Sequence, residues 1–225
     1  MRGDDASLGV TYCGDIRMSS VLKMSAAEQG RAIAAGRVDP VELTEAYLEQ
    51  MKAHADTSRI YACKTPDRAR VEAEAAQQRA KTGGLRSPLD GVPISWKDLF
   101  DSAEYPTEVG SALLAGRVPA EDAEVLANAT AQGLVCLGKT HMSELAFSGL
   151  GLNPVTATPA CINDAAAVAG GSSSGAAASI ACDLAAGAIG SDTGGSVRIP
   201  AAWNDLVGMK TTAGRVSVQG VVPLC

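Results

Sequence analysis

The sequence has few aromatic side chains and only two histidines. Phenylalanine, tryptophan and tyrosine together make up 4% of its 225 residues, and the histidines are His54 and His141. Two isolated histidines without a companion pair of carboxylates do not supply the ligands of a metal site, so we expect no metal. Hydrophobic residues still make up 46% of the chain and charged residues 20%. This composition excludes general disorder and is sufficient for a sizeable buried core.

Regular cysteine spacing and long apolar runs are also absent. The cysteines include no CxxC pair, which favours free thiols in a reducing cytoplasm over disulfides or zinc. Every extended apolar stretch is interrupted by Gly, Ser or Asp, so no membrane span is expected. The N-terminus carries Arg2, Asp4 and Asp5 in place of an apolar segment, which is unlike a signal peptide. These patterns predict a cytoplasmic protein without a membrane partner.

Basic charge is in deficit. The chain has 19 basic and 25 acidic residues, which gives a formal net charge of −6. An acidic balance argues against nucleic acid or an anionic membrane as an obligatory partner. We therefore predict a small-molecule substrate and no nucleic acid, with a homodimer as one option.

The chain divides into three parts by texture. Residues 1–17 have no usable periodicity, and we expect them to form a disordered extension. Capping residues then predict helices within 25–82, opened by Ser25, by Asp39 and by Thr65-Pro66. From residue 88 on, short apolar strands alternate with helices, which is an α/β pattern. In that part we expect buried strands at 89–96 and 134–137, helices at 120–132 and 176–186, and a loop at 149–169.

Two clusters of glycine and serine, Gly170–Gly175 and Asp192–Ser196, flank a run of small residues. The first contains a literal G-x-S-x-G, but the hydrolase triad with that motif needs a histidine after the serine, and both histidines precede it. Neither cluster has the lysine of a phosphate-binding Walker loop, and G-x-G-x-x-G is absent. Flexible loops, or backbone bent tightly around a reacting group, remain as interpretations.

Serine chemistry without histidine needs another base, and Lys97 is a candidate. A serine hydroxyl is a poor nucleophile until a base removes its proton. A lysine performs this task only when burial or neighbouring positive charge lowers its pKa. Lys97 ends an apolar run. On spacing alone, a lysine that extends to solvent at a strand end is the commoner case.

The second cluster supplies the complementary feature. Adjacent glycines before Ser196 allow consecutive backbone N–H groups to turn toward one point, because no Cβ obstructs them. Such donors stabilise the oxyanion of an acyl-transfer intermediate. A simple turn is the alternative for Gly194-Gly195.

The order of these motifs resembles the amidase signature family of serine amidohydrolases. The resemblance rests on Gly91-Val-Pro-Ile-Ser-Trp-Lys-Asp-Leu, on Leu137-Gly-Lys-Thr-His-Met-Ser-Glu-Leu-Ala and on the first glycine cluster. It continues through Gly190-Ser-Asp-Thr-Gly-Gly-Ser-Val-Arg-Ile-Pro-Ala to the region after Gly208.

The resemblance implies a Ser–cis-Ser–Lys triad. By motif position, Lys97 corresponds to the base, Ser172 to the bridging serine after a cis peptide bond, and Ser196 to the nucleophile. The implied oxyanion hole consists of the backbone at Thr193, Gly194, Gly195 and Ser196. Ser173 and Ser148 would support the triad and the acyl pocket. The implied reaction is hydrolysis of a small-molecule amide without a cofactor.

The resemblance also implies a fold, a mixed sheet with helices on both faces. Residues 18–225 would form the N-terminal half of a single amidase domain, with helices at 25–82 and the α/β core at 88–225. Arg198-Ile-Pro-Ala differs from the Arg-Gln-Pro-Ala expected in the glutaminase subunit of a tRNA-dependent amidotransferase, which favours a stand-alone amidase. That glutaminase subunit, and a non-catalytic remnant, remain the alternatives.

Overall fold

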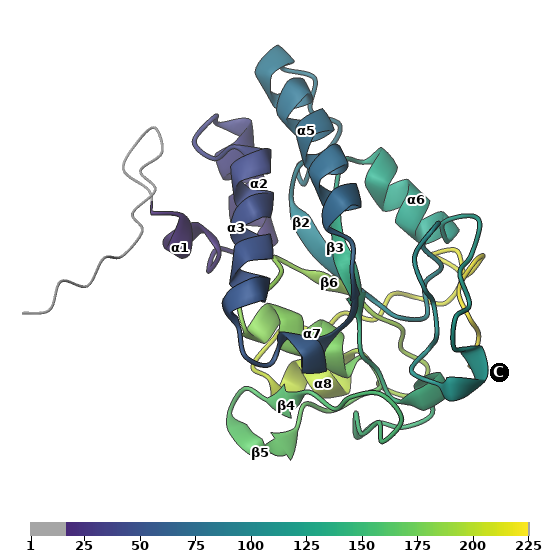
Figure 1. The fold of residues 1–225 in the computed structure, drawn as a ribbon. Helices are drawn as coiled ribbons and strands as arrows, with labels where there is room; N and C mark the ends of the chain where they lie inside the picture. The colour runs from purple at the N-terminus through teal and green to yellow at the C-terminus, as the bar shows by residue number, and fades with distance from the viewer. Residues whose placement is uncertain (1–16, 225) are drawn as a thin grey trace, which may run out of the picture.

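The computed structural model describes residues 17–224. Within them lie eight α-helices, two short 3-10 helices and six strands (Figure 1). The helices are α1 (Met18–Val21), α2 (Ala26–Ala34), α3 (Pro40–Ala53), α4 (Thr57–Ile60), α5 (Pro66–Thr82), η1 (Ala112–Leu114), α6 (Glu124–Ala131), η2 (Glu144–Ala146), α7 (Ser174–Ala181) and α8 (Arg198–Trp203). The strands are β1 (Tyr61–Lys64), β2 (Pro93–Lys97), β3 (Val135–Thr140), β4 (Ala160–Cys161), β5 (Asp164–Val168) and β6 (Ala188–Ile189). The predicted extension at 1–17 lies outside the described residues except for Arg17.

The central sheet is mixed and has the strand order β1-β3-β2-β6. β2 runs parallel to both β3 and β6, whereas β1 pairs with β3 in the antiparallel direction. Helices α3 and α5 pack against β2 and β3, and α7 packs against β2, β3 and β6. The predicted α/β class is confirmed. This topology brings the carboxyl ends of β2, β3 and β6 to one edge of the sheet, where α/β proteins build their sites.

Local capping explains the N-terminal helices. The Ser25 hydroxyl accepts a hydrogen bond from Glu28 N at 3.3 Å, while the Glu28 carboxylate accepts one from Ser25 N at 2.8 Å, which completes the predicted capping box of α2. Asp39 caps α3 through bonds from two backbone amides. The third predicted helix ends at Gly83, whose left-handed backbone conformation suits glycine.

Two segments differ from their predicted structures. The region predicted as a loop at 149–169 contains the antiparallel pair β4–β5, whose strands are largely exposed and lack an apolar alternation. The helix predicted at 176–186 ends at Ala181, because the chain turns at Asp183, where φ is 56°, and then enters β6. The helix predicted at 120–132 is likewise shorter and spans Glu124–Ala131.

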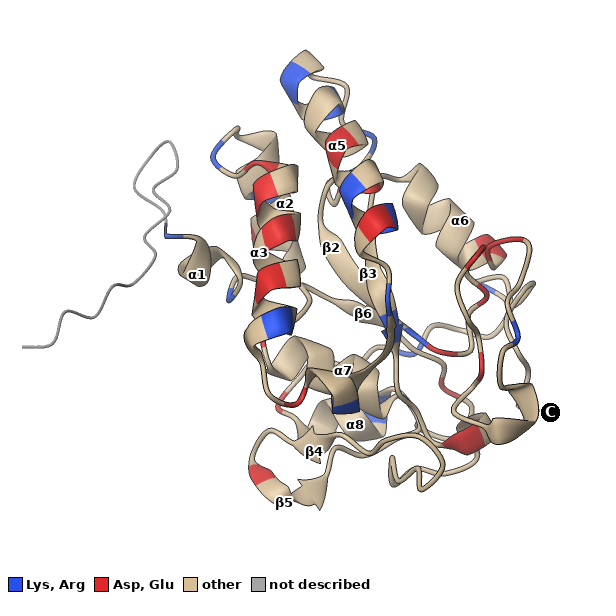
Figure 2. Cartoon of the chain, in the orientation of Figure 1, with Lys and Arg blue, Asp and Glu red and all other residues tan. Residues whose placement is uncertain are grey.

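The core lies between the sheet and the helices. Its largest buried side chains include Trp96, Tyr47 and Leu137, and Trp96 packs edge-on against Phe100 with ring centroids 5.5 Å apart. Charged side chains of both signs cover α3 and α5, whereas α7 carries none (Figure 2). Within residues 17–224, no helix has the length and apolar content that crossing a membrane requires.

Candidate active site

Three segments converge at the carboxyl ends of the parallel strands. Lys97 is the last residue of β2, and the segment that begins at Gly190 follows β6. The residues after β3 reach the first glycine cluster, because Ser143 N donates to Ser172 O at 3.1 Å. The sheet register places these segments side by side, since Trp96 pairs with Ile189 in the parallel β2–β6 ladder.

Lys97 is completely buried and makes two hydrogen bonds to hydroxyls. Its Nζ lies 2.6 Å from Ser172 Oγ and 2.8 Å from Ser191 Oγ. Burial lowers the pKa of Lys97 from 10.5 to about 7, although the negative charge of Asp192 acts in the opposite direction. An ammonium would donate to Ser172, whereas the neutral amine can accept the hydroxyl proton over the same distance. At neutral pH this lysine is therefore suited to accept a proton.

The peptide bond between Gly171 and Ser172 is cis, the isomer that the resemblance implies at this position. Both sides of this bond are held by main-chain hydrogen bonds. Gly171 N donates to Gly149 O at 2.8 Å, and Ser172 O accepts from Ser143 N. No Cβ fits at Gly171, since it would lie 2.5 Å from the backbone nitrogen of Gly151. The segment thus depends on close backbone contact.

Helix α7 begins immediately after this segment and is buried against the end of β3. Gly175 N donates to His141 O at 2.9 Å. A Cβ at Gly175 would lie within 2.7 Å of backbone atoms of Ile60 and His141. The small residues of α7 therefore allow the helix to contact the sheet backbone directly, which sets the position of Ser172.

The second cluster lies beside the first. Ser173 N donates to Ser196 O at 3.1 Å, and Ser173 Oγ donates to Ser191 O at 3.3 Å. No hydrogen bond in the described part of the chain joins the hydroxyls of Ser172 and Ser196. The structure thus brings Lys97 and Ser172 into direct contact, while Ser196 is joined to the group through its main chain.

Asp192 organises the loop that carries Ser196. Its carboxylate accepts hydrogen bonds from Gly195 N at 2.8 Å and from Val197 N at 3.2 Å, and it forms a two-pronged ion pair with Arg198. These bonds, led by that from Arg198, hold the pKa of Asp192 well below its usual range. Of the four predicted oxyanion residues, Gly195 thus has its N–H bound to a carboxylate. The N–H groups of the other three make no hydrogen bond within residues 17–224.

The remaining predicted residues lie at the border of the site. Ser143 Oγ donates to Ser148 O at 3.0 Å, so the loop of Ser148 is tied to the segment that supports Ser172. The hydroxyl of Ser148 itself accepts from Leu150 N and shapes its own turn. Phe147 in this loop is 84% exposed.

Sequence reasoning missed Ser191 and the role of Asp192. Both stand inside the quoted motif that begins at Gly190. Asp followed by a glycine three residues later is a recognisable signal for a side chain that accepts from the backbone of its own turn. The contact between Ser191 and Lys97 has no such local signal, because it joins residues that are far apart in sequence.

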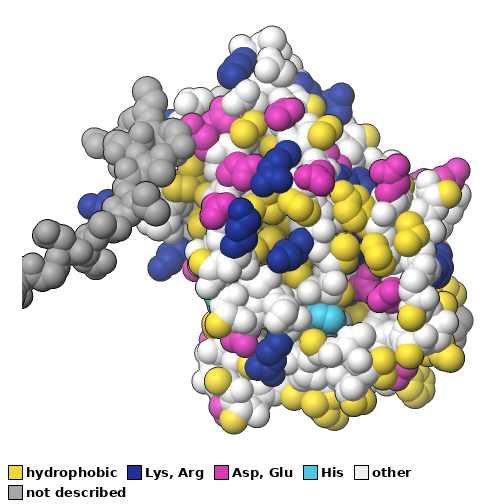
Figure 3. All heavy atoms as spheres, viewed as in Figure 1, with side chains coloured by type: hydrophobic (Ala, Val, Ile, Leu, Met, Phe, Trp, Pro, Cys, Tyr) yellow, Lys and Arg dark blue, Asp and Glu magenta, His cyan; other side chains and the backbone are white. Residues whose placement is uncertain are grey.

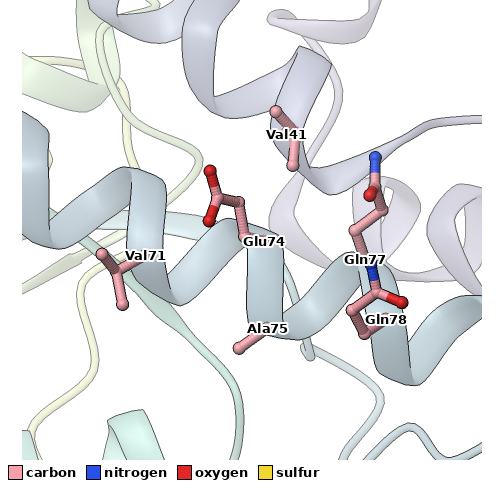
Figure 4. Close-up of a pocket in the computed structure, with 6 residues that line it drawn as sticks. All are labelled: Val41, Val71, Glu74, Ala75, Gln77 and Gln78. Carbon is pink, nitrogen blue, oxygen red and sulfur yellow. The ribbon is translucent and has the colours of Figure 1, made fainter.

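The most open hollow on the described surface is unrelated to these residues. It is a shallow groove between α3 and α5 (Figure 4). The groove is lined by Val41, Val71, Glu74, Ala75, Gln77 and Gln78. It contains no nucleophile and no converging polar groups, so the chemistry of the molecule lies at the sheet edge.

Comparison with known proteins gives consistent matches. The family model described as Amidase matches residues 42–225. One component of the glutamyl-tRNA(Gln) amidotransferase of Anaeromyxobacter dehalogenans is 43% identical over 197 residues, which cover 87% of this chain and 40% of that protein. The corresponding component in Streptomyces coelicolor is 37% identical over 205 residues, covering 91% of this chain and 41% of the relative. The chain thus spans about 40% of the length of these relatives.

Solved structures agree in fold. The native peptide amidase of Stenotrophomonas maltophilia has a TM-score of 0.82 at 36% identity, covering 89% of this chain and 42% of that one. A vestigial protein complex, described as revealing the origins of an s-triazine catabolic enzyme, has a TM-score of 0.83 at 34% identity, with 89% of this chain and 44% of that one covered.

The predicted restriction of partners is wrong. It allowed a small-molecule amide and a second copy of the chain, and it excluded nucleic acid. Two similar proteins are instead named as one of the subunits of an enzyme with a tRNA in its name. The prediction failed because a net charge of −6 is a sum over the whole chain. It reports neither local patches nor surfaces that another protein contributes.

Proposed function

Because the chain belongs to the amidase family, we propose that Lys97, Ser172 and Ser196 carry amide hydrolysis by acyl transfer. The observation that carries this proposal is the 2.6 Å contact between the buried amine of Lys97 and the hydroxyl of Ser172. A buried amine with a pKa near 7 is a proton acceptor at neutral pH. A surface lysine is protonated there and is not.

The proposed reaction begins with a proton relay. Neutral Lys97 takes the hydroxyl proton of Ser172, which takes that of Ser196 as the Ser196 oxygen attacks the amide carbonyl. The relay requires the hydroxyls of Ser172 and Ser196 to come within hydrogen-bond reach when substrate is bound, since such contacts tighten in the complex. Collapse of the tetrahedral intermediate breaks the C–N bond, and the proton returns through Ser172 to the leaving nitrogen.

Water completes the cycle. It attacks the acyl group on Ser196 with Lys97 again accepting a proton through Ser172, and the carboxylic acid leaves as Ser196 regains its hydrogen. The developing oxyanion would be bound by the N–H groups of Thr193, Gly194 and Ser196, which are free of other acceptors within residues 17–224. Asp192 holds the remaining N–H of the loop, at Gly195, and thereby fixes its curvature.

An activity-based fluorophosphonate probe tests this proposal. The probe should label Ser196 in the wild-type chain, and labelling should be lost in Ser196→Ala and reduced at least about a hundredfold in Lys97→Ala. Ser179→Ala is the matched control, because Ser179 is a buried serine of α7 that bonds to Ser95 and not to Lys97. A well-folded wild-type protein that the probe does not label would contradict the proposal and leave a non-catalytic remnant as the interpretation.

A second candidate is the glutaminase function within an amidotransferase. It is favoured by the 43% identity to a component of glutamyl-tRNA(Gln) amidotransferase. The same acyl transfer would then release ammonia from glutamine for an amidotransferase reaction on a tRNA-bound glutamyl group. Release of ammonia from glutamine only in the presence of partner subunits would support this candidate, and hydrolysis of simple carboxamides by the chain alone would contradict it.

The proposed setting of these reactions is the cytoplasm. The cysteines Cys63, Cys136, Cys161 and Cys182 are all unpaired, as in proteins of a reducing compartment. We also propose that residues 18–225 correspond to the N-terminal part of one amidase domain, with a helical segment at 25–82 and the α/β core at 88–225. Limited proteolysis would test this division, since a single domain yields no stable fragment from a cut near residue 85.

A further inference from the structure

Lys97 contacts a second hydroxyl that the proposed triad does not use. Ser191 Oγ lies 2.8 Å from Lys97 Nζ, only slightly farther than Ser172 Oγ at 2.6 Å. Both hydroxyls belong to segments at the same sheet edge, one before α7 and one after β6. The buried amine thus lies between two serines, of which only Ser172 adjoins the proposed nucleophile loop.

The protons on a neutral amine determine what the second hydroxyl does. Such an amine has two N–H donors and one lone pair. To take a proton from Ser172, Lys97 must point its lone pair at Ser172 Oγ. Its N–H groups then point elsewhere, and Ser191 Oγ is the other acceptor that the described residues place on Nζ. Without it, the amine could turn an N–H toward Ser172 and its lone pair away.

The position of Ser191 is fixed from both sides. Ser191 O accepts the hydroxyl of Ser173 at 3.3 Å. On the other side, β6 is hydrogen-bonded to β2, so Lys97 and Ser191 follow from two paired strands. The charged group whose field acts on Lys97 here is Asp192, next to Ser191, which favours the ammonium form.

We propose that Ser191 is a positioning residue, which holds one N–H of the neutral Lys97 amine so that its lone pair faces Ser172. This proposal rests on the function proposed above, because it assigns Lys97 as the base. Ser191 acts through Lys97 and does not itself touch the substrate. After proton transfer, the same hydroxyl accepts from the ammonium and stabilises it.

The test is a titration of Lys97 in the whole chain. Protein with lysine labelled by carbon-13 and nitrogen-15 is followed by NMR from pH 5 to 11, and Lys97→Met assigns the resonance. Ser191→Thr and Ser191→Val are nearly isosteric, and they differ by the hydroxyl. Because a hydrogen bond to the charged form raises the pKa of an amine, the titration midpoint should be about one pH unit lower with valine than with threonine.

Equal midpoints for the threonine and valine variants would overturn the proposal. Should Ser191→Val fail to fold, Ser191→Ala takes its place in the comparison with wild type. Ser179→Ala serves as control, since it removes a buried hydroxyl bond to Ser95 and should lower the melting temperature without moving the Lys97 midpoint.

Labelling of Ser196 by the fluorophosphonate probe separates the two proposals. A midpoint difference without any labelling would support the contact and contradict the acyl-transfer function. Labelling that depends on Lys97 but is unaffected by the valine variant would support the function and contradict the role of Ser191. With both proposals correct, the valine variant should label at least about tenfold more slowly than the threonine variant at pH 8.

Discussion

At the scale of single residues, Lys97 sets how the site responds to pH. Burial lowers the pKa of this amine to about 7, and its two nearest partners, Ser172 and Ser191, are neutral hydroxyls. Below that pH the amine holds its proton and cannot accept another. The rate of fluorophosphonate labelling at Ser196 should therefore rise with pH and level off above about 7.5. A rate that falls over pH 6–8, or that rises only above pH 10, would contradict this assignment.

The same burial affects stability, and its sign can be worked out. The pKa of Lys97 is about 7 in the folded chain and near 10.5 when unfolded. Between these values the unfolded state binds the extra proton, so the wild-type free energy of unfolding rises with pH relative to that of Lys97→Met. The relative gain from pH 7 to 10.5 should be on the order of 4 kcal/mol. Urea unfolding at several pH values measures it.

The control for that experiment is Lys81→Met, a change at an exposed lysine of α5. Its free energy of unfolding should run parallel to that of wild type across the whole pH range. If Lys97→Met also runs parallel to wild type, the amine is not held neutral by burial.

Asp192 should be needed for the shape of the nucleophile loop. Asp192→Asn keeps the size of the side chain but loses the charge that binds Arg198, and its amide cannot accept from Gly195 and Val197 with both ends. We expect the free energy of unfolding to fall by about 1–3 kcal/mol and the labelling rate at Ser196 to fall at least about tenfold.

Asp205→Asn is the matched control for this substitution. Asp205 is exposed and adopts a positive φ of 56°, which asparagine also tolerates. It should leave both quantities unchanged. Equal effects from Asp192→Asn and Asp205→Asn would show that the Asp192 bonds do not shape the loop.

Residue by residue, the sequence indicates the chemistry better than the contacts. The base, the cis serine and the glycine pair belong to short motifs, so they can be read from neighbouring letters. The contact between Lys97 and Ser191 joins residues on different strands. It depends on the β2–β6 register, which no local pattern reveals. The capture of Gly195 N by Asp192 also changes which amides remain for an oxyanion.

At the scale of elements, helix α7 should tolerate no increase in size where it meets the sheet. Gly175→Ala would place a methyl group within 2.7 Å of backbone at Ile60 and His141. Backbone atoms cannot rotate away as side chains do, so we expect a loss of about 2–4 kcal/mol in the free energy of unfolding. Gly84→Ala is the control, because its nearest neighbour would lie 3.6 Å away. Similar melting temperatures for the two variants would contradict this account of α7.

Helices with local capping signals were predictable, and the short strands were not. Ser25, Asp39 and Gly83 act within a few residues of their own positions, so the ends of α2, α3 and α5 follow from sequence. The strands β4 and β5 are exposed and rich in alanine, and they show no alternation of apolar and polar residues. Their pairing is supported by Asn204, whose side chain accepts from Ile162 N and donates to Ala169 O. That support comes from a distant part of the chain.

At the scale of the whole molecule, the segment 207–218 leaves several apolar side chains in solvent. Val207 is fully exposed, and Met209 and Val218 are each more than three-quarters exposed. Exposed apolar surface binds hydrophobic dyes and favours association. We expect the isolated chain to enhance the fluorescence of ANS and to self-associate at high concentration, as measured by sedimentation. Met209→Glu combined with Val207→Glu should reduce both effects.

Leu113→Glu is the control, since Leu113 is equally exposed but lies on η1, apart from that segment. It should change neither dye binding nor association. A monomeric wild-type chain with no ANS enhancement would contradict the prediction.

Charge at this scale is mixed, and no single sign dominates the visible face. Figure 3 shows acidic and basic side chains interspersed with apolar ones on the face that carries α3 and α5. The overall charge was therefore a weak guide to partners. A balance of −6 governs solubility and long-range steering, and it says little about which proteins or substrates the chain meets.

The direct backbone contacts around Gly171 and Gly175 have a consequence for how this site can evolve. Main-chain atoms do the holding, so side chains nearby can be exchanged widely as long as these positions gain no atoms. A scan of all substitutions would then find the strictest intolerance at glycines that perform no chemistry. In such a map the site would be outlined by size limits first, and by Lys97 and the serines second.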